Sequence, residues 1–225
     1  MQETIAIVGG GRMGHALAGA LGAAGPFGRG HDGQGADAVL LCVPDGEIAT
    51  AAAAIAPGRL VGHCSGVTGL DALEPHECFG LHPLMTVTRR GADFAGAGAA
   101  IAGSSARALA FARGLAERLG MRAFEIAAED RAAYHAGASM ASNFLIALET
   151  AAERVSGVDR ALLVPLVRAS VETWAVEGPA ALTGPIARGD EATVACHREA
   201  IAERAPDLLA LYDALADATR EVAAA

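Results

Sequence analysis

The sequence predicts an α/β protein in which a Rossmann-type parallel sheet domain is followed by an all-helical C-terminal domain. Two observations lead to this fold class. Up to about residue 126, short apolar runs typical of buried parallel strands alternate with helical patterns. From Glu129 to the C-terminus, only helical periodicity is present. We therefore predict a boundary near residue 127, with residues 1–127 forming the first domain and residues 128–225 the second.

The elements follow in chain order. A strand over 4–8 is expected to lead through the glycines at 9–11 into a helix from Arg12 to Gly22. The next stretch, 25–35, is too rich in glycine to predict a firm strand. Asp45 is expected to cap a helix over 46–55, and Ser104 or Ser105 a helix that stops at Gly120. Further strands are expected over 38–43, 59–64, 78–81, 99–102 and 122–126. The helices of the second domain are expected over 130–156, 159–176, 190–204 and 206–222.

Composition excludes several classes of function. All 17 basic residues are arginine, so mechanisms that need a lysine amine, such as Schiff-base formation or the P-loop phosphate contact, are excluded. A formal net charge of −9 and few aromatic residues disfavour nucleic-acid binding. The four cysteines form no C-x-x-C pair, and no long charge-free apolar run is present. We expect a reduced cytoplasmic protein without a metal site or a membrane span.

The motif Gly9-x-Gly11-x-x-Gly14 lies between the first expected strand and the first expected helix. In this context the first glycine permits the turn, the second lets the backbone approach a pyrophosphate, and the third lets the helix pack on the strand. The sequence therefore predicts a dinucleotide site, and the alternative is a glycine turn that binds nothing. The residues expected to contact the cofactor here are Gly9, Gly10, Gly11, Arg12, Met13 and Gly14.

The choice between NADP and NAD depends on the residues after the second strand of such a fold. Arg29 would suit the 2′-phosphate of NADP, whereas Asp32 would suit the ribose diol of NAD. Because a guanidinium pairs well with phosphate and Arg12 is also near, we expect NADP, with NAD as the alternative. A solvated loop arginine is the structural alternative for Arg29.

The helix expected after Asp130 carries a polar stripe. At about 100° per residue, His135, Ser139, Ser142 and Asn143 share one side of this helix. In a catalytic interpretation His135 donates a proton, and Asn143 and Ser139 orient a carbonyl group. The alternative is a small-residue packing face with a satisfied histidine.

Two strand ends and one loop supply candidate substrate contacts. Ser65 and His82 follow buried runs, and ligands of open parallel sheets bind beyond the carboxyl ends of the strands. Turn formation explains Ser65 equally well. Arg188, beside a Gly-Pro break, is the first choice for holding an anionic substrate, and Arg131 is the second. Asp190 is expected to cap the helix that follows.

Six segments together resemble a family of predicted bacterial oxidoreductases that pairs a pyrroline-carboxylate-reductase-like Rossmann domain with a helical C-terminal domain of unknown function. They are Gly9-Gly-Gly-Arg-Met-Gly14, Leu41-Cys-Val-Pro-Asp45, His63-Cys-Ser-Gly66, Leu81-His-Pro-Leu84, Tyr134-His135 with Asn143, and Leu182-Thr-Gly-Pro-Ile-Ala-Arg-Gly-Asp190. The resemblance implies a fold of the 6-phosphogluconate-dehydrogenase superfamily, homodimers through the helical domain, and a site between the domains. Val43 and Pro44 join the expected cofactor contacts. Some relatives use a lysine on the helix after the Rossmann domain, so His135 would have to replace it.

These observations lead to one main hypothesis. The chain is expected to be an NADP(H)-dependent oxidoreductase that reduces a small anionic carbonyl or imine compound, with a 2-oxo acid such as ketopantoate as one candidate substrate. A non-catalytic dinucleotide-binding module that senses redox state is the main alternative. A Rossmann-type methyltransferase is a third reading of the glycines alone.

Overall fold

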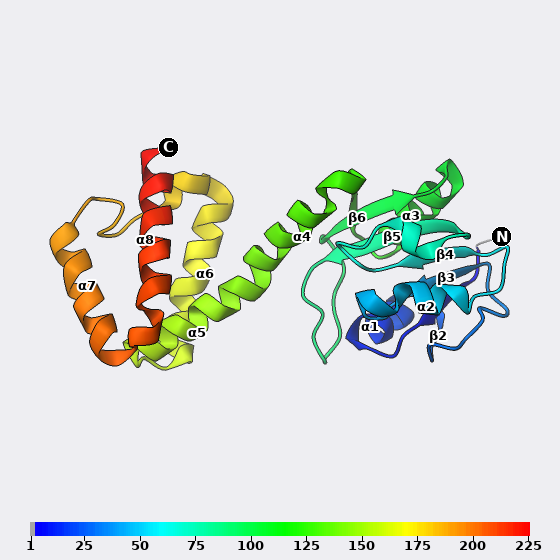
Figure 1. The fold of residues 1–225 in the computed structure, drawn as a ribbon, viewed down its shortest axis with the longest axis horizontal. Coiled ribbons are helices and arrows are strands. Elements are labelled where there is room, and N and C mark those ends of the chain that lie inside the picture. The colour runs from blue at the N-terminus through cyan, green and yellow to red at the C-terminus, as the bar shows by residue number, and fades with distance from the viewer. Residues whose placement is uncertain (1–2) are drawn as a thin grey trace. The chain divides into compact units, whose positions relative to one another are not determined.

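The computed structural model describes residues 3–225, which divide into two compact units between Ser142 and Asn143. The first contains all the strands of the described chain, and the second is helical, as the sequence predicts (Figure 1). The last strand ends at Glu125, whereas the two compact units divide between Ser142 and Asn143. The boundary expected near residue 127 stays a prediction. The assignment of residues 128–225 to substrate binding and dimerisation stays a prediction.

The first unit is built on one seven-stranded sheet with the order β2-β1-β3-β4-β5-β6-β7. The strands are β1 (Ile5–Val8), β2 (Ala24–Phe27), β3 (Ala38–Leu41), β4 (Leu60–His63), β5 (Glu77–Leu84), β6 (Gly98–Gly103) and β7 (Arg122–Glu125). All neighbouring pairs are parallel except β5 and β6. The prediction of a parallel sheet is therefore wrong for the β5–β6 pair. No helix lies between β5 and β6, so the chain lacks the crossover that a parallel return needs.

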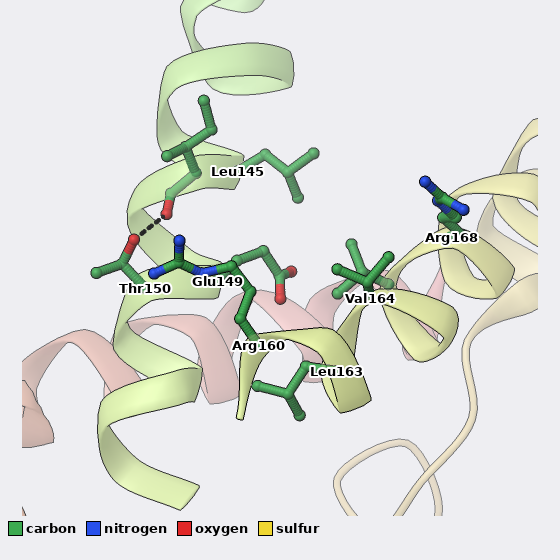
Figure 2. A pocket seen from close by; sticks show the side chains of 9 residues that line it. Leu145, Glu149, Thr150, Arg160, Leu163, Val164 and Arg168 are labelled. Carbon is green, nitrogen blue, oxygen red and sulfur yellow. Dashed lines mark hydrogen bonds between the residues drawn. The ribbon is translucent and has the colours of Figure 1, made fainter. Parts of the chain in front are cut away.

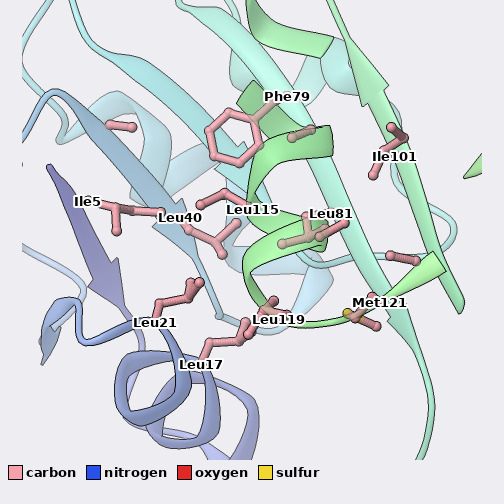
Figure 3. Packing of buried hydrophobic residues seen from close by; sticks show 14 of the residues in the cluster. Ile5, Leu17, Leu21, Leu40, Phe79, Leu81, Ile101, Leu115, Leu119 and Met121 are labelled. Carbon is pink, nitrogen blue, oxygen red and sulfur yellow. The ribbon is translucent and has the colours of Figure 1, made fainter. Parts of the chain in front are cut away.

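Helices cover both faces of the sheet. The helices of the first unit are α1 (Arg12–Leu21), α2 (Ile48–Ala53), α3 (Ala106–Arg118) and α4 (Arg131–Ser139). Ile5 and Ile7 belong to a core that includes α1 and α3 (Figure 3), whereas Ala6 and Val8 belong to a second core that includes α2. Successive strand side chains point to opposite faces. This explains why β1 and β3 are apolar and buried at every position.

Two local expectations are wrong. The glycine-rich stretch does form a strand, β2, which pairs in parallel with β1 at the edge of the sheet. An edge strand tolerates Pro26 because only one side needs backbone hydrogen bonds. Asp45 does not cap α2: it begins a short 3-10 turn, η1 (Asp45–Glu47), and makes no side-chain capping hydrogen bond. Ser105 does cap α3, by accepting a hydrogen bond from the Ala108 amide.

The second unit consists mainly of four helices, α5 (Leu145–Ser156), α6 (Arg160–Glu177), α7 (Glu191–Arg204) and α8 (Leu209–Ala224). Asp159 and Asp190 cap α6 and α7. A hollow of about 420 Å³ lies between α5 and α6 (Figure 2). Its lining is mostly apolar and includes Leu145, Ile146, Leu163, Val164 and Val167. The shorter helical turns are η2 (Leu70–Leu73), η3 (Ala128–Asp130), η5 (Gly178–Ala181) and η6 (Pro206–Leu208).

Candidate functional site

The glycine turn between β1 and α1 is built for close approach. A Cβ atom on Gly9, whose φ is +113°, would lie 2.3 Å from the carbonyl oxygen of Cys42, and one on Gly14 would lie 1.8 Å from that of Gly9. In contrast, a Cβ atom on Gly11 would meet nothing within 4 Å. Gly9 and Gly14 thus hold the turn together, whereas Gly11 leaves open space at the start of α1.

The first turn of α1 is free to bind an anion. Gly11 is the N-cap, no side chain caps the helix, and no acidic residue lies in its first turn. The first amide groups of a helix have no partner within the helix, and the helix dipole favours negative charge at that end. Gly10 and Arg12 are exposed here, and Met13 is half-buried against the core. Val43 and Pro44 follow β3 directly, and Cγ1 of Val43 lies close to the Cβ position of Gly9.

Arg29 and Asp32 differ in how they are engaged. The Nη1 atom of Arg29 lies 2.8 Å from Oε2 of Glu47, and the Arg29 side chain is 63% exposed. Such an exposed ion pair contributes little stability, so a phosphate could replace Glu47 as its partner. The Asp32 carboxylate accepts a hydrogen bond from the Gln34 amide at 2.9 Å. This hydrogen bond uses the carboxylate within its own turn.

His63, at the end of β4, has a structural environment. Its side chain is completely buried. Its Nδ1 atom accepts a hydrogen bond from the Ser65 amide, which places the proton on Nε2, and this group donates to the carbonyl oxygen of Gly69 at 3.1 Å. Burial lowers the pKa of His63. The ring is therefore neutral, with both nitrogens satisfied.

His82, on β5, faces the α4 helix. Its Nδ1 atom and the Tyr134 hydroxyl oxygen are 2.7 Å apart and share a hydrogen bond. Burial lowers the pKa of His82 to about 4 and raises the pKa of Tyr134, so both are uncharged near neutral pH. Together they carry two exchangeable protons, of which the shared bond uses one. The other remains available to donate.

Gly66 brings His135 into the same cluster. A Cβ atom on Gly66 would lie 2.7 Å from Cδ2 of His135 and 3.0 Å from Cε1 of His82. The two imidazole rings are 6.0 Å apart between centroids and nearly perpendicular. The absence of a side chain at Gly66 thus lets both rings pack over the turn after β4. We refer to His82, Tyr134, His135 and Arg131 as the α4 cluster.

Arg131 completes this cluster and is 7% exposed. Its Nη1 group donates a long hydrogen bond of 3.5 Å to the carbonyl oxygen of Gly66. A Cβ atom on Gly80 would lie 3.2 Å from its Nη2 atom, so the guanidinium lies directly over the β5 backbone. Burial lowers the pKa of Arg131.

Ser65 has its hydrogen-bonding capacity used within its own turn. Its Oγ atom accepts from the amides of Val67 and Thr68 and donates to Oγ1 of Thr68 at 2.9 Å. Turn formation therefore accounts for Ser65 without a ligand. A substrate contact by Ser65 stays a prediction.

The polar stripe changes beyond Ser139. Residues Met140–Phe144 form a π-helix, in which hydrogen bonds connect residues five apart. The expectation of one uninterrupted α-helix is therefore wrong, because each residue of the wider turn advances by less than 100°. Ser139 is half-buried at the end of α4, and the Ser142 hydroxyl donates to the carbonyl oxygen of Ala138. Asn143 and Arg188 are exposed in the second unit, and their site roles stay predictions.

The glycine turn and the α4 cluster lie at the same edge of the first unit. Val8, Leu41, His63 and Gly80 are in register across β1, β3, β4 and β5. The strands β1, β3 and β4 end at this level, and β5 continues beyond it to Leu84. Three strand spacings of about 4.8 Å separate β1 from β5. Ligands of such sheets bind at this edge, and one extended dinucleotide could reach from the turn toward the cluster.

Two other site classes find no support in residues 3–225. No group of three or more His, Cys, Asp or Glu side chains there could hold a metal ion. None of the helices described is both long and apolar enough to cross a membrane.

Sequence comparison establishes the family. The model of DUF2520, a domain of unknown function, matches residues 98–219, which is more than half of the chain. The chain belongs to the DUF2520 family. Its resemblance to oxidoreductases that pair a Rossmann domain with a helical domain of unknown function is thereby confirmed. Comparison with the curated proteins gives no match.

Solved structures share the fold over nearly the whole chain. A candidate NADP oxidoreductase from Bacteroides fragilis is 20% identical, with a TM-score of 0.83 and 98% of each chain covered. Protein TM1727 from Thermotoga maritima is 24% identical, with a TM-score of 0.80 and 98% of each chain covered. Pyrroline carboxylate reductase from Plasmodium falciparum, solved with NADP bound, is 14% identical, with a TM-score of 0.60 and 99% of this chain and 98% of that chain covered. These similarities confirm the predicted fold class.

The sequence pattern did not group Tyr134 and Arg131 with His82 and His135 in one cluster. Tyr134 entered only as part of a motif, and Arg131 only as a second choice after Arg188. Arg131 and His135 are four residues apart on one helix, and residues at this spacing share a face. This spacing was the signal that could have grouped them.

Proposed function

We propose that the protein is an NADP(H)-dependent oxidoreductase that reduces a small anionic carbonyl or imine compound, with a 2-oxo acid such as ketopantoate as one candidate. The observation that carries the proposal is the shared edge of the sheet, where an uncapped helix start follows β1 and the hydrogen-bonded His82–Tyr134 pair lies at β5, three strand spacings away. The relatives named for NADP or crystallised with it support the cofactor.

The residues of the glycine turn fit a dinucleotide. The open space beside Gly11 and the uncapped start of α1 would accept the pyrophosphate. Arg29, released from Glu47, would hold a 2′-phosphate, and Val43 and Pro44 would border the cofactor where β3 ends. When bound, the nicotinamide would supply the hydride.

The α4 cluster would supply the proton. His135 is half-buried on α4 and lies against His82 across Gly66. We assign it the role of general acid toward the developing negative charge on the substrate oxygen or nitrogen. The neutral His82–Tyr134 pair would position it. Ser139 and Asn143 are the candidates for orienting the substrate.

The cofactor is tested by titrating nucleotide-stripped protein with NADPH and with NADH, following nicotinamide fluorescence. Saturable binding with a preference for NADPH is expected. If neither binds at about millimolar concentration, the glycine turn is structural and the proposal fails. A panel of 2-oxo acids and cyclic imines then tests turnover. NADPH binding without turnover on any of them would favour the redox-sensing alternative.

The role of His135 is tested separately. His135→Ala should keep NADPH affinity and lose most turnover, because it removes the proton donor and not the phosphate contacts. The control is His15→Ala, at an exposed position on α1. Unchanged turnover in His135→Ala would remove His135 from the catalytic step.

We also propose that the protein is a homodimer formed through the second unit. Leu162 and Leu166 on α6 are 72% and 66% exposed, and Trp174 and Val176 are exposed as well. An apolar surface of this kind in a soluble chain marks an interaction site. The hollow between α5 and α6 (Figure 2) extends it. A second copy would bury both.

Sedimentation velocity tests this assembly. Leu166→Glu should shift a dimer toward monomer, whereas Ala202→Glu adds the same charge on an exposed position of α7 and should not. A monomeric wild-type protein at about 50 μM, far above the Kd of a stable dimer, would overturn the proposal.

A further inference from the structure

Arg131 is a buried cation without a counter-ion. Its side chain is more than nine-tenths buried, yet among residues 3–225 no carboxylate lies within 4 Å of its guanidinium. Its one hydrogen bond, to the Gly66 carbonyl oxygen, is long. A guanidinium has five N–H donors, so most of them have no protein partner. The N–H groups without a partner are reached by solvent, because the one buried side-chain polar atom without a partner among residues 3–225 is Nε2 of His31. A bound anion could therefore pair with them.

The surroundings of Arg131 leave its charge uncompensated. Tyr134, His82 and His63, three titratable groups that interact electrostatically with Arg131, are uncharged near neutral pH. The Asp45 carboxylate acts on His63 and His82 from the loop after β3, but it makes no ion pair with Arg131. Arg131 is thus a cation with no ion-pair partner among residues 3–225, beside the uncharged side chains of Tyr134, His82 and His63.

Two glycines give the guanidinium its place. Gly80 lets Nη2 of Arg131 approach the β5 backbone, because a Cβ atom at this position would lie only 3.2 Å from Nη2. Gly66 provides the carbonyl oxygen that accepts from Nη1. A guanidinium held at its edge in this way presents its remaining N–H groups in one plane. This planar pair of donors matches a carboxylate, which accepts two parallel hydrogen bonds.

We propose that Arg131 binds the carboxylate group of the substrate, beside the side chains of Tyr134, His82 and His135. The inference rests on the proposed function, because it names the substrate class of that same site: a small monocarboxylate with a carbonyl or imine carbon beside the carboxylate. A dianionic phosphate fits less well. Arg131 is the one arginine that acts on His82, and the negative charge of Asp45, which also acts there, opposes a second negative charge on the ligand.

Arg131 also places the reacting group. A carboxylate fixed between the guanidinium and the turn at Gly66 would leave the adjacent carbon near His135 and His82, because both imidazole rings lie against this turn, and Tyr134 is hydrogen-bonded to His82. Arg131 and His135 are four residues apart on α4. The anchor and the proton donor are thereby held on one rigid element.

The test uses oxamate, a 2-oxo-acid analogue with a carboxylate, and oxamide, its uncharged counterpart of the same shape. Histidine ring signals of the full-length protein are followed by NMR with and without NADP⁺. In the wild type, oxamate should shift the His82 and His135 signals in a saturable way, and oxamide at equal concentration should not. Arg131→Gln should weaken oxamate binding at least about tenfold, because it removes the charged fork.

Two further variants keep the test decisive. Arg107→Gln removes one positive charge from α3, where Arg107 pairs with Glu3 and Glu77, and should bind oxamate as the wild type does. Arg131→Lys keeps the charge but loses the fork, so it should bind with intermediate affinity and serves if the glutamine variant does not fold.

Several results would overturn the inference: wild-type affinity for oxamate in both Arg131 variants, equal binding of oxamide, tighter binding of inorganic phosphate, or no binding of oxamate at all. NADPH titration of the same samples separates the two proposals. NADPH binding without oxamate binding overturns only the role of Arg131. Oxamate binding that depends on Arg131, in a protein that binds no NADPH, overturns the proposed function and leaves the carboxylate site standing.

Discussion

The protonation of His82 should make the first unit acid-sensitive in a defined pH range. Burial lowers the pKa of His82 to about 4, with smaller contributions from the charges of His135 and Arg131 on α4 and of His63 on β4, while Asp45 after β3 opposes the shift. The ordinary value is 6.5. The folded protein therefore binds fewer protons than the unfolded chain between about pH 6.5 and pH 4. Stability is fully present above this range and is lost as the pH falls through it.

The magnitude follows from the shift. Each pKa unit corresponds to about 1.4 kcal/mol, so a shift of about 2.5 units makes His82 protonation worth about 3 kcal/mol of unfolding free energy. His82→Asn keeps a polar atom near the Tyr134 hydroxyl but cannot be protonated. We expect the stability advantage of the wild type over this variant to shrink by most of that amount between about pH 7 and pH 4.

Urea unfolding followed by circular dichroism at several pH values measures this difference, and NMR titration of the His82 ring gives its folded-state pKa directly. His15→Gln, on the exposed side of α1, is the matched control and should keep the pH dependence of the wild type. The reasoning is refuted if His82→Asn and the wild type lose stability in parallel, or if His82 titrates near 6.5 in the folded protein.

Substitutions at the two sites provide further tests. Gly66→Ala places a Cβ atom 2.7 Å from the His135 ring, so we expect a loss of about 1–3 kcal/mol of unfolding free energy. The control is Gly46→Ala, whose Cβ atom meets nothing within 4 Å and which should cost less. Equal melting temperatures of the two variants would contradict the close packing at Gly66. Gly11→Ala should fold normally but bind NADPH at least about tenfold more weakly in a fluorescence titration, and unchanged affinity would place the phosphates elsewhere. Glu47→Gln frees Arg29 and should raise the preference for NADPH over NADH; a constant ratio would remove Arg29 from the cofactor site.

Local sequence was sufficient for most of the first unit. Continuous apolar runs such as 38–41 identify strands that are buried on both faces. Ser105, Asp159 and Asp190 were correctly placed as helix caps or starts, because a capping side chain acts on its own next turn. The sequence did not show that β6 runs antiparallel to β5, because an apolar run looks the same in a parallel and an antiparallel strand.

Non-local packing decided the remaining features. The strand over Ala24–Phe27 forms because β1 offers it an edge, although its own residues are poor strand formers. The π-helix at Met140–Phe144 has no signal in periodicity, and it displaces Asn143 from the expected stripe. The cluster around Gly66 joins residues from β4, β5 and α4, so no local pattern could show it.

The sequence alone determined the fold class, the glycine turn and the chemistry that is excluded without lysine. These follow from local spacing and composition, which act over one turn or one strand. The tertiary structure decided which polar groups meet. It paired His82 with Tyr134 across 52 positions, used the Ser65 hydroxyl within its own turn, and buried Arg131 without a counter-ion. Burial and partnership arise from contacts between distant segments, and they assign the anion-binding role to Arg131.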